Sequence, residues 1–247
     1  MNRSEGRAHD ALRPVRVTRP YLKHTHGSCL FELGDTKVLC AASITEGVAA
    51  WRRGSQKGWV TAEYALLPAS THIRTRREST GGGLRGRTHE IQRLIGRSLR
   101  TVVDMGAMGG EVTMSVDCDV IQADGGTRTA AITGAYLAVH DAFATWRDLG
   151  KISELPLIDF VAATSVGMVD GVCMLDLDYA EDSVAEIDMN VVMDGRGRFI
   201  EVQGTGERTP FDRARLDEML DLATAGIDRL IEFQRTAIAG VADVTEL

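Results

Sequence analysis

Four stretches of the first half of the chain predict strands, either by alternating apolar and polar residues, the period of a strand with one buried face, or by short apolar segments. Residues 112–120 are the clearest case, with Val, Met and Cys at every second position and Thr, Ser and Asp between them. Residues 30–33 and 37–43 flank a Gly-Asp-Thr turn and predict a hairpin. Residues 59–67 predict a further strand, which ends before a proline.

Three segments instead have apolar residues at helical spacing. The first begins at residue 88 and continues to about residue 102. The second, residues 129–149, lacks proline and is rich in Ala and Leu, and residues 126–128 belong to its first turn. The third, residues 216–231, has one apolar face near the end of the chain.

The second half of the chain also places strand hairpins before a helix. Residues 157–169 and a segment through Leu177 flank Asp170-Gly171, a strong hairpin signal. Residues 187–193 and 199–202 flank a second glycine-containing turn.

Because strand hairpins are followed by helices twice, we predict an α+β protein, with mixed sheets packed against helices. Its two halves, residues 1–150 and 151–247, are expected to form one compact unit.

Composition sets limits on the class of protein. The 247 residues are 44% hydrophobic and 26% charged, contain no apolar run of about 18 residues, and begin with a charged segment unlike a signal peptide. We therefore expect a cytoplasmic protein without a membrane partner. The four cysteines lack metal-binding spacing and sit in apolar runs, which favours buried, reduced thiols.

The charge is divided unevenly along the chain. Residues 1–100 carry 18 Lys and Arg and 8 Asp and Glu, a net +10, whereas residues 101–247 carry 10 and 27, a net −17. Such asymmetry is one sign of nucleic-acid contact, although contacts between the two parts could also neutralise it.

Arginines gather in two neighbouring places of the basic part. A polar, glycine-rich segment at residues 69–87 predicts a mobile, positively charged loop, and the helix after it has a row of arginines on one face. An ordinary solvated helix face would show the same row. The candidate RNA-binding residues are Arg74, Arg76, Arg77, Arg93 and Arg97.

Residues 122–129, Gln-Ala-Asp-Gly-Gly-Thr-Arg-Thr, join the alternating strand to the second helix. Free N–H groups at such a helix start attract anions, the glycines allow close approach of the backbone, and Arg128 adds a bidentate charge. A simple strand-to-helix turn is the alternative interpretation, but neighbouring features favour a phosphate site.

Six carboxylates are concentrated in residues 176–188. Carboxylates this dense repel one another unless a cation, arginines or protons intervene. Mg²⁺ usually takes one or two carboxylates together with substrate phosphate, which suits Asp182 and Asp188. The alternative is a solvated acidic loop in which Glu181 and Glu186 face water.

Together these features indicate chemistry at a phosphodiester. The chain has no Ser/His/Asp nucleophile set, no cluster of its six histidines and no P-loop.

Five separated segments resemble the bacterial ribonuclease PH family, in order and over nearly the whole chain. They are residues 58–64, 86–95, 117–129, 181–190 and 200–205. The resemblance implies the ribonuclease PH fold, shared with phosphorolytic subunits of polynucleotide phosphorylase and the exosome. It also implies a ring-shaped homo-hexamer built as a trimer of dimers.

The activity that the resemblance implies is that of a tRNA nucleotidyltransferase. Such an enzyme trims the 3′ end of tRNA precursors, with ribosomal RNA as a further substrate, and uses inorganic phosphate to release nucleoside diphosphates. The reverse reaction adds nucleotides. By motif, the phosphate ligands are Arg87, Gly126, Thr127 and Arg128. Asp182 and Asp188 are the acidic pair near Mg²⁺, one of them the general acid.

Two other functions stay open at this point. A non-catalytic RNA-binding ring subunit would not need the phosphate and acidic residues, all of which are present here. A hydrolytic, metal-dependent nuclease would need the acidic pair but not the phosphate site, and it would release monophosphates.

Overall fold

The first of two sheets is built from strands of the N-terminal half. The computed structural model describes residue 3 and residues 6–240. The strands lie in the order β1-β2-β3-β5-β4, antiparallel except for the parallel pair β4 and β5. Their bounds are β1 (Val15–Thr18), β2 (Gly27–Leu33), β3 (Thr36–Glu46), β4 (Trp59–Leu66) and β5 (Val112–Gln122).

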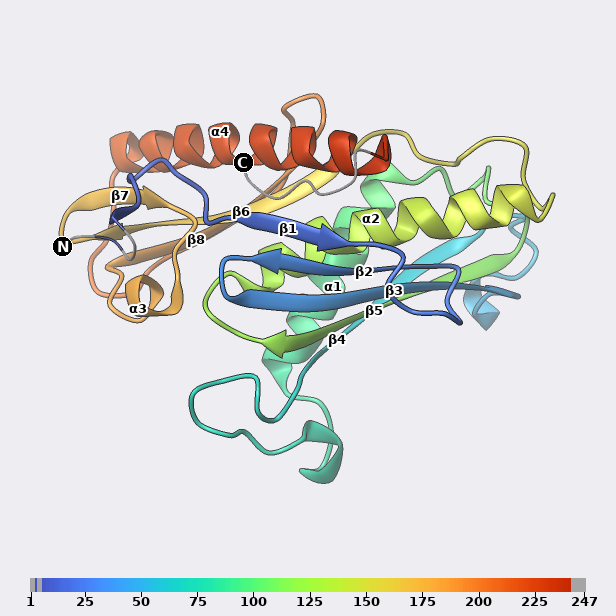
Figure 1. Cartoon of the computed structure of the whole chain (residues 1–247), viewed down its shortest axis with the longest axis horizontal. Coiled ribbons are helices and arrows are strands. Elements are labelled where there is room, and N and C mark those ends of the chain that lie inside the picture. The colour runs from blue at the N-terminus through green and yellow to red at the C-terminus, as the bar shows by residue number, and fades with distance from the viewer. Residues whose placement is uncertain (1–2, 4–5, 241–247) are drawn as a thin grey trace.

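The parallel pair requires a crossover, and α1 (Gly86–Val102) supplies it. The segment between β4 and α1 is the basic segment noted in the sequence, and it contains a short 3₁₀ helix at Glu78–Thr80. A second 3₁₀ helix, Ala50–Arg52, lies between β3 and β4. In Figure 1 the loop before α1 extends away from the body of the protein.

The second sheet is wholly antiparallel and belongs to the C-terminal half. Its order is β7-β6-β8-β9. The bounds are β6 (Val161–Val169), β7 (Val172–Leu175), β8 (Ile187–Asp194) and β9 (Phe199–Gly206), with the short helix α3 (Tyr179–Asp182) between β7 and β8. Asp170 and Gly171 have φ values of 51° and 74°, as a tight hairpin turn requires.

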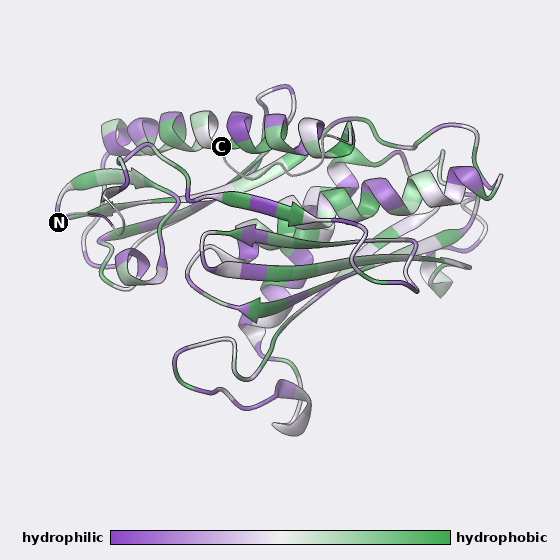
Figure 2. Cartoon of the chain, viewed as in Figure 1, coloured by the Kyte–Doolittle hydropathy of each residue, from purple (hydrophilic) through white to green (hydrophobic). Residues whose placement is uncertain are grey.

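Two long helices join the sheets into one core. Helix α2 (Thr127–Asp148) is buried on nearly all sides and packs on β2, β3 and β6, while α4 (Arg213–Ile238) packs on β6 and β7. A Cβ at Gly134 would lie 2.7 Å from Phe31 Cβ, so α2 needs glycine there to approach β2. Hydrophilic and hydrophobic residues alternate along α4, whose apolar side covers the second sheet (Figures 1 and 2).

The structure bears out the predicted hairpins and the three longer helices, with some changes at their ends. The strand predicted from residue 157 begins at Val161, and Leu157 instead forms an isolated bridge with Val103. Strand β7 ends at Leu175, because Asp176 adopts a positive φ of 54°. Strand β1 and helix α3 were not predicted. Each has only four residues, too few for a period to register.

None of the helices in the described part of the chain has the length and apolar character needed to cross a bilayer.

Candidate active site

A pocket of about 850 Å³ opens where the end of β5, the starts of α1 and α2, and the second sheet meet. Residues from both halves of the chain line it. All six residues predicted to bind phosphate or to form the acidic pair are among them: Arg87, Gly126, Thr127, Arg128, Asp182 and Asp188. The structure thus brings together side chains separated by about a hundred positions in the sequence.

The start of α2 forms one wall of the pocket. Gly125 and Gly126 have φ values of 77° and 63°, and no side chain caps the helix at Gly126 within the described structure. A Cβ on Gly125 would lie 2.6 Å from the carbonyl oxygen of Leu177, so only glycine fits. The uncapped first-turn N–H groups and the helix dipole make this wall suited to an anion.

Tyr64 supports this wall from β4. Its phenol donates a hydrogen bond to Thr127 Oγ1 over 2.8 Å. Burial raises the pKa of Tyr64, so the phenol keeps its proton at neutral pH and stays a donor. The hydrogen bond fixes the Thr127 side chain at the edge of the pocket.

Two arginines face the same space. Arg87 lies in the first turn of α1 and is exposed to solvent. Arg128 lies in the first turn of α2 and donates to Gln203 Oε1 over 2.9 Å, while Glu90 lies 3.8 Å from the same guanidinium nitrogen. Gln203 also donates to Glu90 over 2.6 Å. This pair of contacts from β9 and α1 orients the Arg128 fork.

The acidic pair comes from the second half of the chain, with Asp182 at the end of α3 and Asp188 in β8, and both line the pocket. Burial and the neighbouring Asp182 charge raise the pKa of Asp188 to about 6, against the opposing charges of Arg128 and Arg87. Burial likewise raises the pKa of Asp182, with Arg87 and Arg128 opposing it. These two carboxyls and two arginines therefore share one electrostatic environment.

The donor set fits Mg²⁺ held jointly with a substrate. Among the described residues there is no group of three or more His, Cys, Asp or Glu side chains placed to hold a metal ion. Mg²⁺ commonly uses only one or two carboxylates and takes its other oxygens from phosphate and water. Burial and the Asp182 charge raise the Asp188 pKa, and a bound cation would favour the ionised form of this carboxyl.

The alternative of a solvated acidic loop does not hold for Glu181, which does not face water. Glu181 is buried and accepts hydrogen bonds from Arg3 Nε over 2.8 Å and from Arg7 over 3.1 Å. It also forms a capping box with Asp178 around α3. The acidic segment is thus not a solvated loop, because arginines from the N-terminal segment neutralise part of it and hold α3 in place.

The candidate RNA-binding residues lie outside the lining of the pocket. Arg74, Arg76 and Arg77 are exposed in the loop before α1, whose neighbouring residues His72, Ile73 and Thr75 do line the pocket. The loop therefore leads from the exposed arginines to the pocket.

The arginine row on α1 is less open than the sequence indicated. Arg97 forms an ion pair with Glu201 of β9 over 2.8 Å. Arg100 is half-buried, lies over the ring of Trp59 and donates to the carbonyl of Val60. Arg93 is exposed.

The chain belongs to the 3′ exoribonuclease family: domain 1 of that family matches residues 11–144 and domain 2 matches residues 159–226. It is similar to a protein of Syntrophomonas wolfei subsp. wolfei named ribonuclease PH, with 56% identity over 238 residues, which cover 96% of this chain and 99% of that protein. The resemblance seen in five segments of the sequence is thereby confirmed.

Solved structures agree on the fold. The rice protein Rrp46 superposes with a TM-score of 0.77 at 23% identity, covering 96% of this chain and 100% of that one. A chain of the Archaeoglobus fulgidus exosome, solved with RNA bound to the active site, gives 0.79 at 22% identity and covers 94% of this chain and 92% of that one. The predicted α+β fold is confirmed.

Sequence reasoning did not single out Tyr64 or Gln203, although both lie inside segments that carried the family resemblance. Arg13, described below, lies outside those segments. Its surroundings depend on contacts more than a hundred residues away in sequence, so no local pattern could have marked it.

Proposed function

We propose that this protein is a phosphorolytic 3′-to-5′ exoribonuclease that shortens the 3′ ends of tRNA precursors, with ribosomal RNA as a further substrate. The observation that supports this most directly is the single pocket that combines an anion-binding helix start with two arginines and a carboxylate pair. A hydrolytic nuclease would need the carboxylates but would have no use for a second phosphate site. The 56% identical relative named ribonuclease PH supports the same choice.

In the proposed reaction, inorganic phosphate occupies the start of α2, where the N–H groups of the first turn and the side chains of Arg87, Thr127 and Arg128 bind it. One phosphate oxygen attacks the phosphorus of the last phosphodiester in line with the O3′ leaving group. The new P–O bond yields a nucleoside 5′-diphosphate, and the broken P–O3′ bond leaves a shortened RNA. The two arginines reduce repulsion between the attacking and the attacked phosphate.

The leaving O3′ needs a proton, and Asp188 is the proposed donor. A carboxyl with a pKa of about 6 keeps part of its population protonated near neutral pH, unlike an ordinary aspartate. Asp182, the more exposed of the pair, is the proposed first ligand of Mg²⁺, whereas Asp188 can bind the ion only when ionised and therefore donates its proton while Asp182 alone holds the ion. The ion, when bound, would neutralise negative charge on the phosphates.

The division of labour follows the two halves of the chain. We assign phosphate binding to residues 1–150 and the acidic pair to residues 151–247, so that neither half is a complete site. Arg74, Arg76, Arg77, Arg93 and Arg97 are proposed to contact the RNA backbone outside the pocket. Because Arg97 already pairs with Glu201, RNA would have to compete with that carboxylate.

We further propose a homo-hexameric ring, a trimer of dimers. It is supported by the likeness of this fold to chains of exosome cores. A cytoplasmic location suits four cysteines that are all buried and unpaired. The mass of the purified protein by light scattering tests the ring, since a hexamer has six times the mass of one chain.

Product identification tests the reaction itself. The purified protein is incubated with a short 3′-extended tRNA and Mg²⁺, with and without inorganic phosphate. Nucleoside diphosphates that form only with phosphate support phosphorolysis. Monophosphates formed without phosphate would mean hydrolysis, and no release would favour a non-catalytic RNA-binding subunit.

A further inference from the structure

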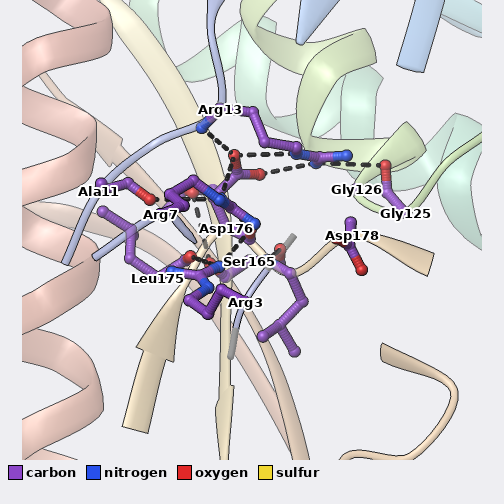
Figure 3. Close-up of polar contacts among 12 residues, drawn as sticks. Arg3, Arg7, Ala11, Arg13, Gly125, Gly126, Ser165, Leu175, Asp176 and Asp178 are labelled. Carbon is purple, nitrogen blue, oxygen red and sulfur yellow. Dashed lines mark hydrogen bonds and ion pairs between the residues drawn. The ribbon is translucent and has the colours of Figure 1, made fainter. Parts of the chain in front are cut away.

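Arg13 precedes β1, and its buried side chain extends toward Gly125 and Gly126 in the turn between β5 and α2 (Figure 3). One side of its guanidinium donates two hydrogen bonds to the Asp176 carboxylate, from Nε over 3.0 Å and from a terminal nitrogen over 2.7 Å. The backbone N–H of Arg13 donates to the same carboxylate over 2.7 Å. These three contacts leave the guanidinium a single orientation.

The other side of the guanidinium reaches the turn. Its terminal nitrogens donate to the backbone carbonyls of Asp124 and Gly125, the second over 3.4 Å. Thr36 assists from β3, since its hydroxyl donates to the Gly125 carbonyl over 2.6 Å and accepts from the Asp124 N–H over 2.9 Å. Two side chains thus hold the two carbonyls that precede the phosphate-binding glycine.

Neither Arg13 nor Thr36 lines the phosphate pocket. Arg13 and Asp124 line a separate hollow of about 280 Å³, whereas Gly125 and Gly126 line the pocket itself. Arg13 is therefore not a ligand of the phosphate in this arrangement. Its positive charge favours ionisation of Asp182, and its hydrogen bonds act on the phosphate-binding turn through the backbone.

The geometry of the peptide bond relates the position of these carbonyls to the direction of the N–H groups that follow them. In a trans peptide the C=O of one residue and the N–H of the next point in opposite directions. Drawing the Asp124 and Gly125 carbonyls toward Arg13 turns the N–H groups of Gly125 and Gly126 toward the pocket. It also removes two carbonyl dipoles that would repel an anion.

The Asp176 carboxylate neutralises the charge of the buried Arg13 guanidinium and so offsets the cost of burying it. Burial opposes ionisation of this carboxyl, but the charge and hydrogen bonds of Arg13 outweigh burial and hold the pKa of Asp176 below its usual range. Arg7 and Arg3 donate to the backbone carbonyl of Asp176 over 2.8 and 3.1 Å. The carboxylate is therefore fixed to the N-terminal segment and to the end of β7, the strand that leads into α3 and Asp182.

We infer that Arg13 and Thr36 are positioning residues for inorganic phosphate, which hold the 124–125 carbonyls away from the pocket, with Asp176 as the buried anchor of Arg13. This inference rests on the proposed phosphorolytic function. It adds to the proposed direct ligands Arg87, Thr127 and Arg128 a side-chain pair that never touches the phosphate but orients the backbone that binds it.

Thr36→Val gives the sharpest test, because valine has the shape of threonine and lacks only the hydroxyl. We expect its KM for phosphate to rise about tenfold, because both hydrogen bonds between the Thr36 hydroxyl and the turn are lost. The KM for a short RNA and kcat at saturating phosphate stay near those of the unmodified enzyme. Thr36→Ser, which keeps the hydroxyl, restores the phosphate KM.

Arg13→Lys is a second test variant, and a substitution of the exposed neighbour Arg16 is its control. Lysine keeps the charge but cannot reach Asp176 and both carbonyls at once, so its phosphate KM also rises. Arg16→Gln on β1 removes a charge from an exposed position nearby and leaves the phosphate KM unchanged. Melting temperatures identify variants that fail to fold. If Arg13→Lys is among them, the phosphate KM of Thr36→Val alone tests the positioning role.

A readout without turnover separates this inference from the proposed function. Phosphate binding by calorimetry in the absence of RNA should weaken about tenfold in Thr36→Val and recover in Thr36→Ser. If the unmodified protein binds phosphate but releases no diphosphates, phosphorolysis fails while the positioning role can still hold. Equal phosphate affinity in all folded variants would overturn the positioning role.

Discussion

The guanidinium of Arg128 at the start of α2 donates a hydrogen bond to Gln203 Oε1 on β9 over 2.9 Å. This contact joins the helix that offers its N–H groups to an anion and the sheet that carries Asp188. Since the same Gln203 also donates to Glu90 of α1, three elements meet at one amide. The direction of the Arg128 fork into the pocket is therefore set by residues from both halves of the chain.

Arg128→Ala should raise the KM for phosphate by about a hundredfold, because a preorganised donor to the reacting phosphate is lost. The side chain lies at the pocket edge, so folding should change little, with a shift in Tm of no more than about 4 °C. Steady-state phosphorolysis at varied phosphate measures the first effect and thermal unfolding the second. Unchanged dependence on phosphate would show that Arg128 is not a phosphate ligand.

A matched pair separates the charge of Arg128 from its orientation. Gln203→Leu keeps the arginine but removes its acceptor, so we expect a rise in the phosphate KM of about three- to tenfold. Arg128→Lys keeps the charge and loses the fork, and should fall between Gln203→Leu and Arg128→Ala. If Gln203→Leu were as damaging as Arg128→Ala, the amide would have a role beyond orientation.

Asp182→Asn should lower kcat by about a thousandfold while RNA binding stays intact, because the amide can neither hold Mg²⁺ as an anion nor share a proton with Asp188. Single-turnover phosphorolysis and filter binding measure the two quantities. Glu186→Gln is the control, since Glu186 belongs to the same acidic segment but does not line the pocket. Comparable loss in both variants would point to the segment's net charge rather than to Asp182.

The exposed loop arginines should act on RNA and not on phosphate. Replacing Arg74, Arg76 and Arg77 together by Ala should weaken tRNA binding and reduce the salt slope of log K by up to about three. The phosphate KM with a very short oligonucleotide should not change. An unaltered salt slope would place the tRNA elsewhere on the protein.

Mg²⁺ affinity should depend on pH through Asp188. The carboxyl has a pKa raised to about 6, so protons compete with the cation below that pH. Affinity should increase between about pH 5 and pH 7 as the carboxylate forms. Calorimetric titration of Mg²⁺ checks this, and Asp188→Asn should bind weakly with little pH dependence over the same range. A flat profile in the unmodified protein would exclude Asp188 as a ligand.

Periodicity was sufficient to predict the long elements of the fold. Strand β5 has one buried and one open face, and α1 has an apolar side, so burial leaves a regular trace in the sequence. Strand β1 and helix α3 show no such periodic pattern, because each is too short and is held by residues distant in the sequence. The strands of the second sheet could be predicted mainly from the turns that join them, such as Asp170-Gly171.

Some residues of the candidate site could likewise be predicted from the sequence and others could not. Residues proposed to touch substrate, such as Arg128 and Asp188, lie in motifs whose composition indicates their chemistry. Residues that orient them do not. The contact between Arg13 and Asp176 spans 163 positions, and an arginine beside a proline in the sequence shows nothing of its burial. The burial of Glu181 leaves no sign in the sequence for the same reason, since its partners Arg3 and Arg7 lie 178 and 174 positions away.

A structural ion pair away from the pocket provides a test of acid stability. Arg19 bonds to the carboxylate of Asp141 on α2, with Nε 2.9 Å from Oδ2, and donates to the Ala237 carbonyl of α4 over 2.6 Å. Burial would raise the pKa of Asp141, but hydrogen bonds from His140 and Arg19 outweigh it and lower the pKa. The folded protein therefore holds this carboxyl ionised more firmly than the unfolded chain does.

The sign of the pH effect follows from that difference. A carboxyl whose pKa is depressed on folding stabilises the protein above the unfolded pKa, and this stabilisation disappears as the pH falls through the folded pKa. At pH 7, Asp141→Asn should lower the free energy of unfolding by about 1 kcal/mol, and the gap to the unmodified protein should close progressively below about pH 4. Urea unfolding at several pH values measures the gap. Activity at pH 7 should be unaffected, because Asp141 does not line the catalytic pocket. A gap that stayed constant down to pH 3 would mean that the amide disturbs packing and that the charge of Asp141 contributes nothing.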